Sequence, residues 1–414
     1  MTRPRKILHV LNNAGGGAAL STVELMRMIR AEGIRSCAVC HDSGTAEERA
    51  ALDAAAGGEV LYTRLYWLNR KIRMPLWRRP LSEAKQIMAT GWSLSSTAQV
   101  ARYARQTRAE LIHTNTSLNP EGGRAAYRLG LPHVWHIREL LGVGNPFRLS
   151  REGVAFGRYM ARYASKVVAN SQTTAVQIRD WLPPGLLEVV PNGIDISRFQ
   201  LREPRREQCG PLVVAMVGNL TSRSKKHALL VEAAARVNAQ LPIEWRIYGH
   251  DPSAGGTKRG DPYIDELHQR IVRHALQQRF TWPGFFRDQA QIMSQIDVLV
   301  HPADNESFGR IAVEAMAAGL PVVGMRGGGI AEIVVDGETG LLAPPDDAAA
   351  LAAAIERLAR DPALRANMGR AGRLRAESLY SLPAHTTAML RVYEQAMERP
   401  LGHSRGHHLE SIND

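Results

Sequence analysis

The sequence has few of the features that cross-link a protein or anchor it in a membrane. Its three cysteines, in 414 residues, cannot form a disulfide framework, which is typical of a reducing compartment. No apolar run reaches the roughly 18 residues of a membrane-spanning helix. The first apolar run is also too short for a signal peptide, so we expect a β-strand there and a cytoplasmic protein.

Metal-binding patterns are equally scarce. Cys37 and Cys40 form the only CxxC pair. A zinc site needs about four ligands, and the sequence has no second pair that would complete one. We therefore expect both cysteines to pack within a strand, and we expect no bound metal.

What is present is the composition of a globular protein with one basic half. Hydrophobic residues make up 44% of the chain and charged residues 22%, which is typical of soluble globular proteins. Residues 1–190 contain 26 Lys/Arg and 14 Asp/Glu, whereas residues 191–414 contain 26 of each. The whole excess of +12 thus lies in the first half, which favours an anionic partner such as phosphate, nucleic acid or a membrane surface.

Strands and helices are expected to alternate in two successive series. The first contains a helix at 18–30 and strands at 6–11, 36–40, 111–114, 133–137 and 166–170. The second contains helices at 226–240, 262–277 and 308–318 and strands at 211–218, 244–249, 279–284, 297–302 and 320–324. Such alternation predicts an α/β fold of two doubly wound domains with parallel sheets and a cleft between them.

The turn cluster PNGID, at 191–195, marks the expected boundary between these domains. We therefore predict an N-terminal domain over 1–190 and a second domain over 191–382. A C-terminal helix at 383–400 and a mobile tail at 401–414 are expected to follow.

The clearest chemical pattern is a pair of glutamates in HPADNESFGRIAVEAMAAGLPVV, residues 301–323. Glu306 follows a predicted strand, and Glu314 lies inside the helix that begins near Gly309. Ligands of open α/β sheets bind beyond the carboxyl ends of strands, and a helix start favours an anion. A diphosphate there would have one carboxylate at each end. The alternatives are a surface ion pair between Arg310 and Glu314, and a solvated loop acid at Glu306.

This segment resembles the E-x7-E signature of retaining nucleotide-sugar glycosyltransferases of the family-4 type, which have the GT-B fold of two facing Rossmann-like domains. Five segments resemble the family in its own order: 16–34, 189–199, 217–237, 298–310 and 327–347. The resemblance implies transfer of a sugar from a nucleotide-diphosphate sugar to an acceptor hydroxyl with retention, in cell-surface polysaccharide or glycolipid biosynthesis. The sequence contains no Asp-x-Asp, with which other transferases hold a metal ion, and no cofactor is expected.

The resemblance also implies roles for the donor-binding residues. Glu314 would contact the ribose and Glu306 the transferred sugar, while the donor phosphates would meet the backbone amides of Phe308, Gly309 and Arg310. In the first domain, Gly16 and Gly17 would let a loop approach these phosphates, or would only form a tight turn.

The chain departs from the family at its usual Arg and Lys pair, which appears here as Asn219 and Lys225. Lys225 keeps a cation for the diphosphate, but Asn219 does not. Arg223 either replaces the missing cation or faces solvent. Lys226 stands where the family commonly has glycine.

The acceptor side is expected in the first domain. Many relatives carry His-Asp at the strand end that corresponds to LPHVWHIREL, where this chain has Arg138 and Glu139. His136 lies two residues before Arg138, on the same strand face, so both are expected to point into the cleft. Alternatively, His136 is only a packed strand residue. His113 and Asn115, at another strand end, are further acceptor-side candidates, as is Glu139.

Part of the basic excess lies in YTRLYWLNRKIRMPLWRRP, residues 62–80, which has no acidic residue and several aromatic ones. Basic and aromatic side chains favour an anionic membrane surface, and Pro75 and Pro80 argue against one continuous helix. We expect a loop or short broken helix that docks on the inner face of the cytoplasmic membrane, with an acceptor sugar or lipid-linked glycan as partner. The alternative is a solvated basic loop over an acidic patch.

Two other functions remain to be compared. A GT-B epimerase would act on the nucleotide sugar itself and would need no acceptor. A basic nucleic-acid-binding protein would leave the glutamate pair unexplained, and the basic residues are not interleaved with a recognised nucleic-acid motif. We therefore expect no nucleic-acid partner.

Overall fold

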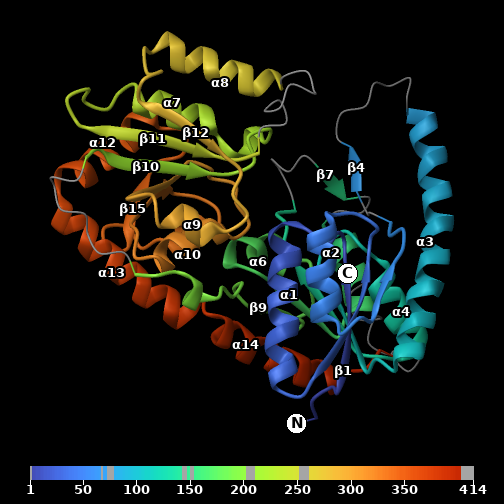
Figure 1. Ribbon diagram of the computed structural model, residues 1–414. Helices are drawn as coiled ribbons and strands as arrows, with labels where there is room; N and C mark the ends of the chain where they lie inside the picture. Colours follow the sequence, from blue (N-terminus) through green and yellow to red (C-terminus); the bar gives the residue numbers. More distant parts are fainter. Residues whose placement is uncertain are drawn as a thin grey trace. The chain divides into compact units, whose positions relative to one another are not determined.

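The computed structural model describes residues 2–66, 69–71, 79–141, 147–149, 153–201, 210–250 and 261–401, without side chains over 69–71, 79–90 and 147–149. The chain divides into two compact units (Figure 1). The first contains Met1–Gly193 and Leu382–Asp414, and the second contains Ile194–Ser381. The first division lies within the turn cluster 191–195.

The first unit is built on a seven-stranded sheet of order β3-β2-β1-β5-β6-β8-β9, in which all described pairings are parallel. Its strands are β1 (Lys6–Leu11), β2 (Arg35–Cys40), β3 (Val60–Tyr62), β5 (Leu111–Thr114), β6 (His133–Ile137), β8 (Lys166–Ala169) and β9 (Leu187–Val189). The predicted strands 6–11, 111–114 and 133–137 are confirmed residue for residue. Strands β3 and β9 were not predicted.

Helices cover both faces of this sheet. They are α1 (Gly16–Ala31), α2 (Ala46–Ala55), α3 (Arg79–Thr107), α4 (Glu121–Leu129), α5 (Val154–Tyr163), α6 (Gln172–Arg179) and α14 (Leu382–Met397). Successive side chains of β1 point to opposite faces. Ile7 packs in a cluster with α1 and α14, whereas Leu8 packs in a cluster with α3 and α4. Burial on both faces explains the continuous apolar run of this parallel strand.

Helix α14 follows the second unit in sequence but packs on the first. It lies beside α1 (Figure 1), and Met389, Val392 and Tyr393 are buried in the cluster that contains Ile7. Leu401, the first residue of the expected tail, is also buried in the first unit, and residues 402–414 lie outside the described residues. The C-terminal helix is therefore part of the first unit.

Two sequence expectations for the first unit are settled by β2 and α3. Cys37 and Cys40 lie in apolar clusters on opposite faces of the sheet, so the CxxC pair cannot share one ligand. Pro80 lies in the first turn of the 29-residue helix α3, where proline is tolerated, so this end of the basic segment is helical. Residues 72–78 lie outside the described residues.

Strands β4 (Asn69–Lys71) and β7 (Phe147–Leu149) form a separate antiparallel pair.

The second unit contains a six-stranded sheet of order β12-β11-β10-β13-β14-β15, again with parallel pairings. The strands are β10 (Leu212–Val217), β11 (Ile243–Tyr248), β12 (Phe280–Gly284), β13 (Val298–His301), β14 (Val322–Met325) and β15 (Gly340–Ala343). The helical elements are η2 (Ile196–Arg198), η3 (Arg223–Lys225), α7 (His227–Ala234), α8 (Pro262–Arg273), α9 (Gln289–Met293), α10 (Arg310–Ala317), α11 (Ile330–Ile333), α12 (Ala348–Arg360) and α13 (Pro362–Leu379).

This sheet also separates two apolar layers. Val214 and Met216 of β10 pack on the side of α7, α8 and α12, and Val213 packs on the side of α10 and α13. The predicted helix 226–240 is wrong at its end, because α7 stops at Ala234 and Asn238 closes a turn by accepting a hydrogen bond from the amide of Gln240 at 2.9 Å. The predicted α/β class is confirmed in both units. No helix among the described residues is both long and apolar enough to cross a membrane.

Candidate active site

The centre of the second sheet is the place where a ligand of this architecture would bind. Strand order runs outward in both directions from β10, so the connections that follow β10 and β13 leave the sheet beside each other. Parallel sheets bind their ligands at such a switch point, beyond the carboxyl ends of the strands. The two connections are 218–226, which leads into α7, and 302–309, which leads into α10.

Each of these connections contributes one charge to a close ion pair. Lys225 Nζ donates to Glu306 Oε2 at 2.5 Å, and His301 Nε2 lies 3.4 Å from the same oxygen. Burial alone would raise the pKa of Glu306, but the His301 ring and the Lys225 charge outweigh it and hold the pKa at about 2. Glu306 is therefore an ionised, held carboxylate and not a solvated loop acid.

Helix α10 begins beside this pair. Gly309 has φ 93°, in the left-handed region that favours glycine, and a Cβ there would lie 2.4 Å from Ile330 Cδ1. One turn into the helix, Arg310 Nε donates to Glu314 Oε1 at 2.8 Å, with side-chain exposures of 14% and 5%. The predicted pair between these residues thus exists, but it is part-buried in the first turns of the helix and not a surface pair.

The missing cation at Asn219 is not replaced by Arg223 in this structure. Asn219 Oδ1 accepts hydrogen bonds from the amide and hydroxyl of Thr221 and so closes the turn after β10. The Arg223 guanidinium instead lies 4.4 Å above the Tyr263 ring and 3.0 Å from Glu266 Oε2, both on α8. It is held by α8 and not directed at Lys225.

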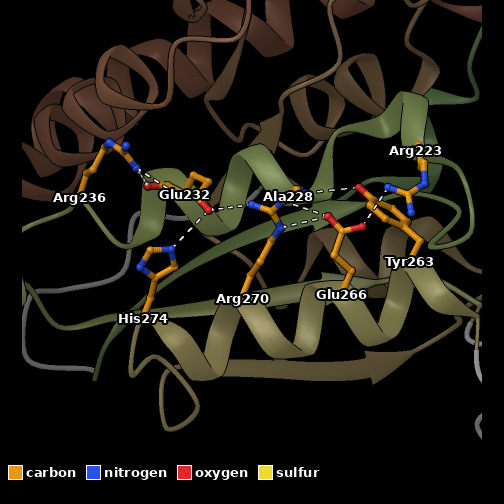
Figure 2. Close-up of polar contacts among 8 residues, drawn as sticks. All are labelled: Arg223, Ala228, Glu232, Arg236, Tyr263, Glu266, Arg270 and His274. Carbon is orange, nitrogen blue, oxygen red and sulfur yellow. Dashed lines mark hydrogen bonds and ion pairs between the residues drawn. The ribbon is translucent and has the colours of Figure 1, made fainter.

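Figure 2 shows that this contact is the end of a longer network between α7 and α8. Glu266 also accepts from Arg270 at 2.9 Å, and Arg270 donates to Glu232 on α7 at 3.0 Å. Hydrogen bonds from Arg270 and Arg223 hold the pKa of Glu266 below its usual value. Alternating charges therefore place the Arg223 guanidinium on α8, with its side chain 63% exposed, and a contact of Arg223 with the ligand stays a prediction.

Lys226 has a backbone conformation that is unusual for a lysine. Its φ is 57°, in the left-handed region, which explains why a glycine would suit this position. The lysine compensates with two contacts, because Nζ lies 2.7 Å from Asp304 Oδ1 and 2.7 Å from Asp346 Oδ1. It thereby ties the connection after β13 to the start of α7.

A pocket of about 370 Å³ opens beside the end of β10. Its wall includes Gly218, Asn219, Tyr248, Gly249, His250, Phe285 and Phe286. A Cβ at Gly249 would lie 2.2 Å from the Gly218 carbonyl oxygen, so only glycine fits between the two strand ends. Phe285 is 60% exposed at this wall, although large apolar side chains are usually covered. The pocket suits a flat, partly apolar group.

The two histidines of this region were not predicted as site residues from the sequence. His301 ends β13 and His227 begins α7, and both are buried. Only their positions in the sequence could have identified them, because each is next to an expected strand end or helix start. A single histidine in an apolar segment is more often a packed residue, so position alone did not distinguish them.

In the first unit, Gly16 and Gly17 begin α1 after β1, and a Cβ at either would meet no atom within 4 Å. Gly16 has φ 79° and so needs glycine for its conformation, whereas Gly17 does not. Both are exposed at the start of the helix. A tight turn accounts for the first glycine, and a ligand contact for either stays a prediction.

His113, an acceptor-side candidate, and His136, expected to be catalytic with Glu306 and Arg138, are both buried inside the first unit. His113 and His136 are each 0% exposed and stack with ring centroids 5.5 Å apart, and His9 lies 5.3 Å beyond His113. His113 Nδ1 is 2.8 Å from the hydroxyl of Tyr393 on α14. His136 therefore packs in the sheet, which is the alternative considered for it from the sequence.

Arg138 and Glu139 organise the strand ends around them. The Arg138 guanidinium donates to the side-chain oxygens of Asn192 and Asn115, the latter at 3.4 Å. Glu139 accepts hydrogen bonds from both the amide and the hydroxyl of Ser117, at 3.0 and 2.9 Å. The structure thus brings Arg138, Asn115 and Glu139 together at the ends of β5 and β6, with Arg138 only 5% exposed.

Two facts together define the class of this protein: two doubly wound parallel α/β units, and a lysine–glutamate pair with a second glutamate at the switch point of one of them. Comparison with known proteins agrees. Residues 15–198 match the model of Glycosyltransferase Family 4, and residues 197–375 match that of Glycosyl transferases group 1. The chain belongs to the glycosyltransferase family that contains these two domains, and it has the GT-B fold.

Individual relatives are similar over much of the chain. D-inositol 3-phosphate glycosyltransferase of Saccharomonospora viridis is 30% identical over 307 residues, which cover 70% of each chain. Glycogen synthase of Mycobacterium tuberculosis is 31% identical over 247 residues, but the match spans only 58% of its length. Anabaena HepE, solved in complex with UDP, is 24% identical with a TM-score of 0.74 over 94% of this chain and 99% of that one.

The buried histidines predict a pH-dependent stability. Burial lowers the pKa of His9 to about 3 and that of His133 to about 4, and holds those of His113 and His136 well below the usual value. Below about pH 6.5 the unfolded chain binds protons that the folded unit does not. The free energy of unfolding should therefore decrease as the pH is lowered below about 6.5. Each of these histidines should contribute a decrease of about 1.4 kcal/mol for each pH unit.

Urea unfolding at about pH 7.5 and pH 5.5 measures this effect. His136→Leu, which keeps an apolar group in the buried site, should lose less stability between the two pH values than the unmodified protein. His41→Leu, at a half-buried position of the same unit, is the matched control and should keep the original pH dependence. Equal pH dependence in all three proteins would contradict the assignment.

Proposed function

We propose that this protein is a retaining glycosyltransferase that moves a hexose from a nucleotide-diphosphate sugar to an acceptor hydroxyl. The observation that carries the proposal is the Lys225–Glu306 pair at the switch point of the second sheet, beside the start of α10. A cation, helix amides and a held carboxylate are what an anionic donor with a sugar at one end requires.

The donor is expected to lie across the ends of β10 and β13. The pocket at Gly218 would take the base, because aromatic side chains line it. Glu314 would accept from the ribose hydroxyls and Glu306 from the hydroxyls of the transferred sugar. Anabaena HepE, which is described in complex with UDP-glucose, supports a nucleotide-sugar donor, and a relative named glycogen synthase supports transfer of a hexose.

In the reaction, negative charge develops on the departing diphosphate. Lys225 and the α10 amides would stabilise it, and such groups act most strongly when they are already in place. Lys225 has three N–H donors, so it can keep its contact with Glu306 and still bind a phosphate oxygen. The diphosphate is a good leaving group, so two close carboxylates of the glycosidase kind are not required.

The acceptor is expected on the basic first unit. The side chains at the centre of segment 62–80, including Arg70 and Lys71, lie outside the described residues. Close to it in sequence, Trp92 and Leu94 of α3 are 61% and 49% exposed. We propose that this region docks on the anionic inner face of the cytoplasmic membrane, with a lipid-linked glycan as acceptor for polysaccharide or glycolipid synthesis.

Substitution of the two glutamates tests the donor site. Glu314→Gln should weaken UDP-glucose binding by about 1.5–3 kcal/mol, because the ribose loses a charged acceptor. Glu306→Ala should reduce turnover without lowering the unfolding temperature in proportion. Calorimetry and transfer assays measure both, and Glu377→Gln, in an exposed ion pair with Arg373 on α13, is the control. Unchanged affinity in the first variant and unchanged turnover in the second would refute the roles. An isomerised donor formed without any acceptor would favour an epimerase.

Chelation tests the source of the positive charge. Because Lys225 and helix amides can neutralise the diphosphate, we expect the transfer rate to be the same after exhaustive treatment with EDTA. The rate is compared before chelation, after it, and after Mg²⁺ or Mn²⁺ is returned. Activity that disappears with EDTA and reappears with either metal would show that a metal is needed.

Vesicle sedimentation tests the membrane surface. Binding should require anionic lipid, fall with salt, and weaken when Arg70, Lys71, Arg73, Arg78 and Arg79 are changed to Ser, since each basic side chain contributes about 1 kcal/mol near such a surface. The control is the same number of changes to Ser at exposed arginines of the second unit: Arg236, Arg273, Arg357, Arg360 and Arg370. Equal binding to neutral vesicles, or none at low salt, would exclude the membrane role.

A further inference from the structure

His227 is a buried titratable group next to the proposed diphosphate site. It is the first residue of α7 and is 0% exposed, and neither ring nitrogen has a hydrogen-bond partner among the described residues. Buried polar groups are nearly always hydrogen-bonded, and one left unpaired costs about 1–3 kcal/mol. In this position, next to the proposed diphosphate site, the missing hydrogen bond could be made by a group that arrives with the ligand.

The pocket residue Gly218 lies close to this ring. Gly218 lines the pocket and has no side chain, so the space above it is open. The point that a Cβ would occupy at Gly218 lies 3.7 Å from His227 Nε2 and 3.4 Å from Lys225 Cγ. A ligand atom a few tenths of an ångström closer to the ring would be within hydrogen-bond distance of Nε2. The same ligand would lie beside Lys225.

The charges around His227 come from three neighbouring elements. Lys225 lies two residues before it, His301 ends the adjacent strand β13 with Glu306 beyond it, and Tyr263 of α8 faces it with ring centroids 6.1 Å apart. Burial first, and then the Lys225 charge and His301, lower the pKa of His227 to about 4. With the site empty, His227 is therefore neutral near pH 7. A diphosphate placed between Lys225 and His227 would reverse this electrostatic preference.

We infer that His227 takes up one proton from solvent when the donor diphosphate binds, and then donates a charged hydrogen bond to a phosphate oxygen. It thereby supplies the second cation that Asn219 does not provide and that Arg223, held by Glu266, does not reach. The inference rests on the proposed donor site. Under this inference, the second cation forms only when the donor is bound, so donor binding is coupled to the uptake of one proton.

The linkage has a measurable size. While the pH lies between the two pKa values of His227, affinity for the donor falls about tenfold for each pH unit gained. A nucleotide sugar is a suitable probe because its diphosphate diester does not titrate near neutral pH, unlike the terminal phosphate of a free nucleoside diphosphate. UDP-glucose is the first probe, followed by ADP-glucose and GDP-mannose if it does not bind.

Calorimetric titration of the full chain at about pH 7, in buffers of different ionisation enthalpy, counts the protons taken up. We expect about one per donor with the unmodified protein. His227→Gln, which keeps a polar group but cannot become charged, should bind the donor about tenfold more weakly and take up none. His268→Gln, at an exposed histidine of α8 that packs on Trp282, should take up one.

The outcomes separate this inference from the proposed function. Donor binding with no proton uptake by the unmodified protein overturns the inference and leaves the donor site standing, even if His227→Gln does not fold. Uptake that persists in a folded His227→Gln protein also overturns it. Failure of every nucleotide sugar to bind would refute the donor site itself.

Discussion

Parallel pairing of the strands is the constraint on which the rest of this structure depends. It forces each strand to be followed by a helix on a face of the sheet, and it collects every strand's carboxyl end at one edge. Residues 81 positions apart can therefore meet, as Lys225 and Glu306 do at 2.5 Å. The burial of both faces leaves this edge as the natural place for polar side chains to gather.

The same edge in both units contains buried histidines. In the first unit they form a row across β1, β5 and β6, and in the second they lie at the end of β13 and the start of α7. A histidine in such a place is apolar enough to be buried yet keeps a proton site available. In the first unit the row is expected to make stability depend on pH. In the second it lies beside the proposed ligand site, where a change of charge would have a chemical use.

The sequence predicted the features that depend on neighbouring residues, and it missed those that depend on contacts between distant segments. Strands such as Lys6–Leu11 are short apolar runs, a local property. The family motifs predicted one site for Lys225, Glu306 and Glu314, and the structure shows the contact between the first two. Helix α3 was missed because its 29 residues show almost no apolar periodicity. Two features depend on packing between distant segments, which no local pattern encodes. One is the contact of Arg223 with Glu266, 43 residues away, and the other is the packing of α14 on the sheet of the first unit.

The return of α14 to the first unit makes the second unit an insertion whose two ends meet, since Ile194 pairs with Ser381 and its amide donates to the Tyr380 carbonyl at 2.8 Å. The order of synthesis on the ribosome then differs from the order of assembly. Residues 194–381 are complete while the first sheet still lacks Met389, Val392 and Tyr393, which arrive with the last segment of the chain. The unit that is translated second is the one able to finish folding first.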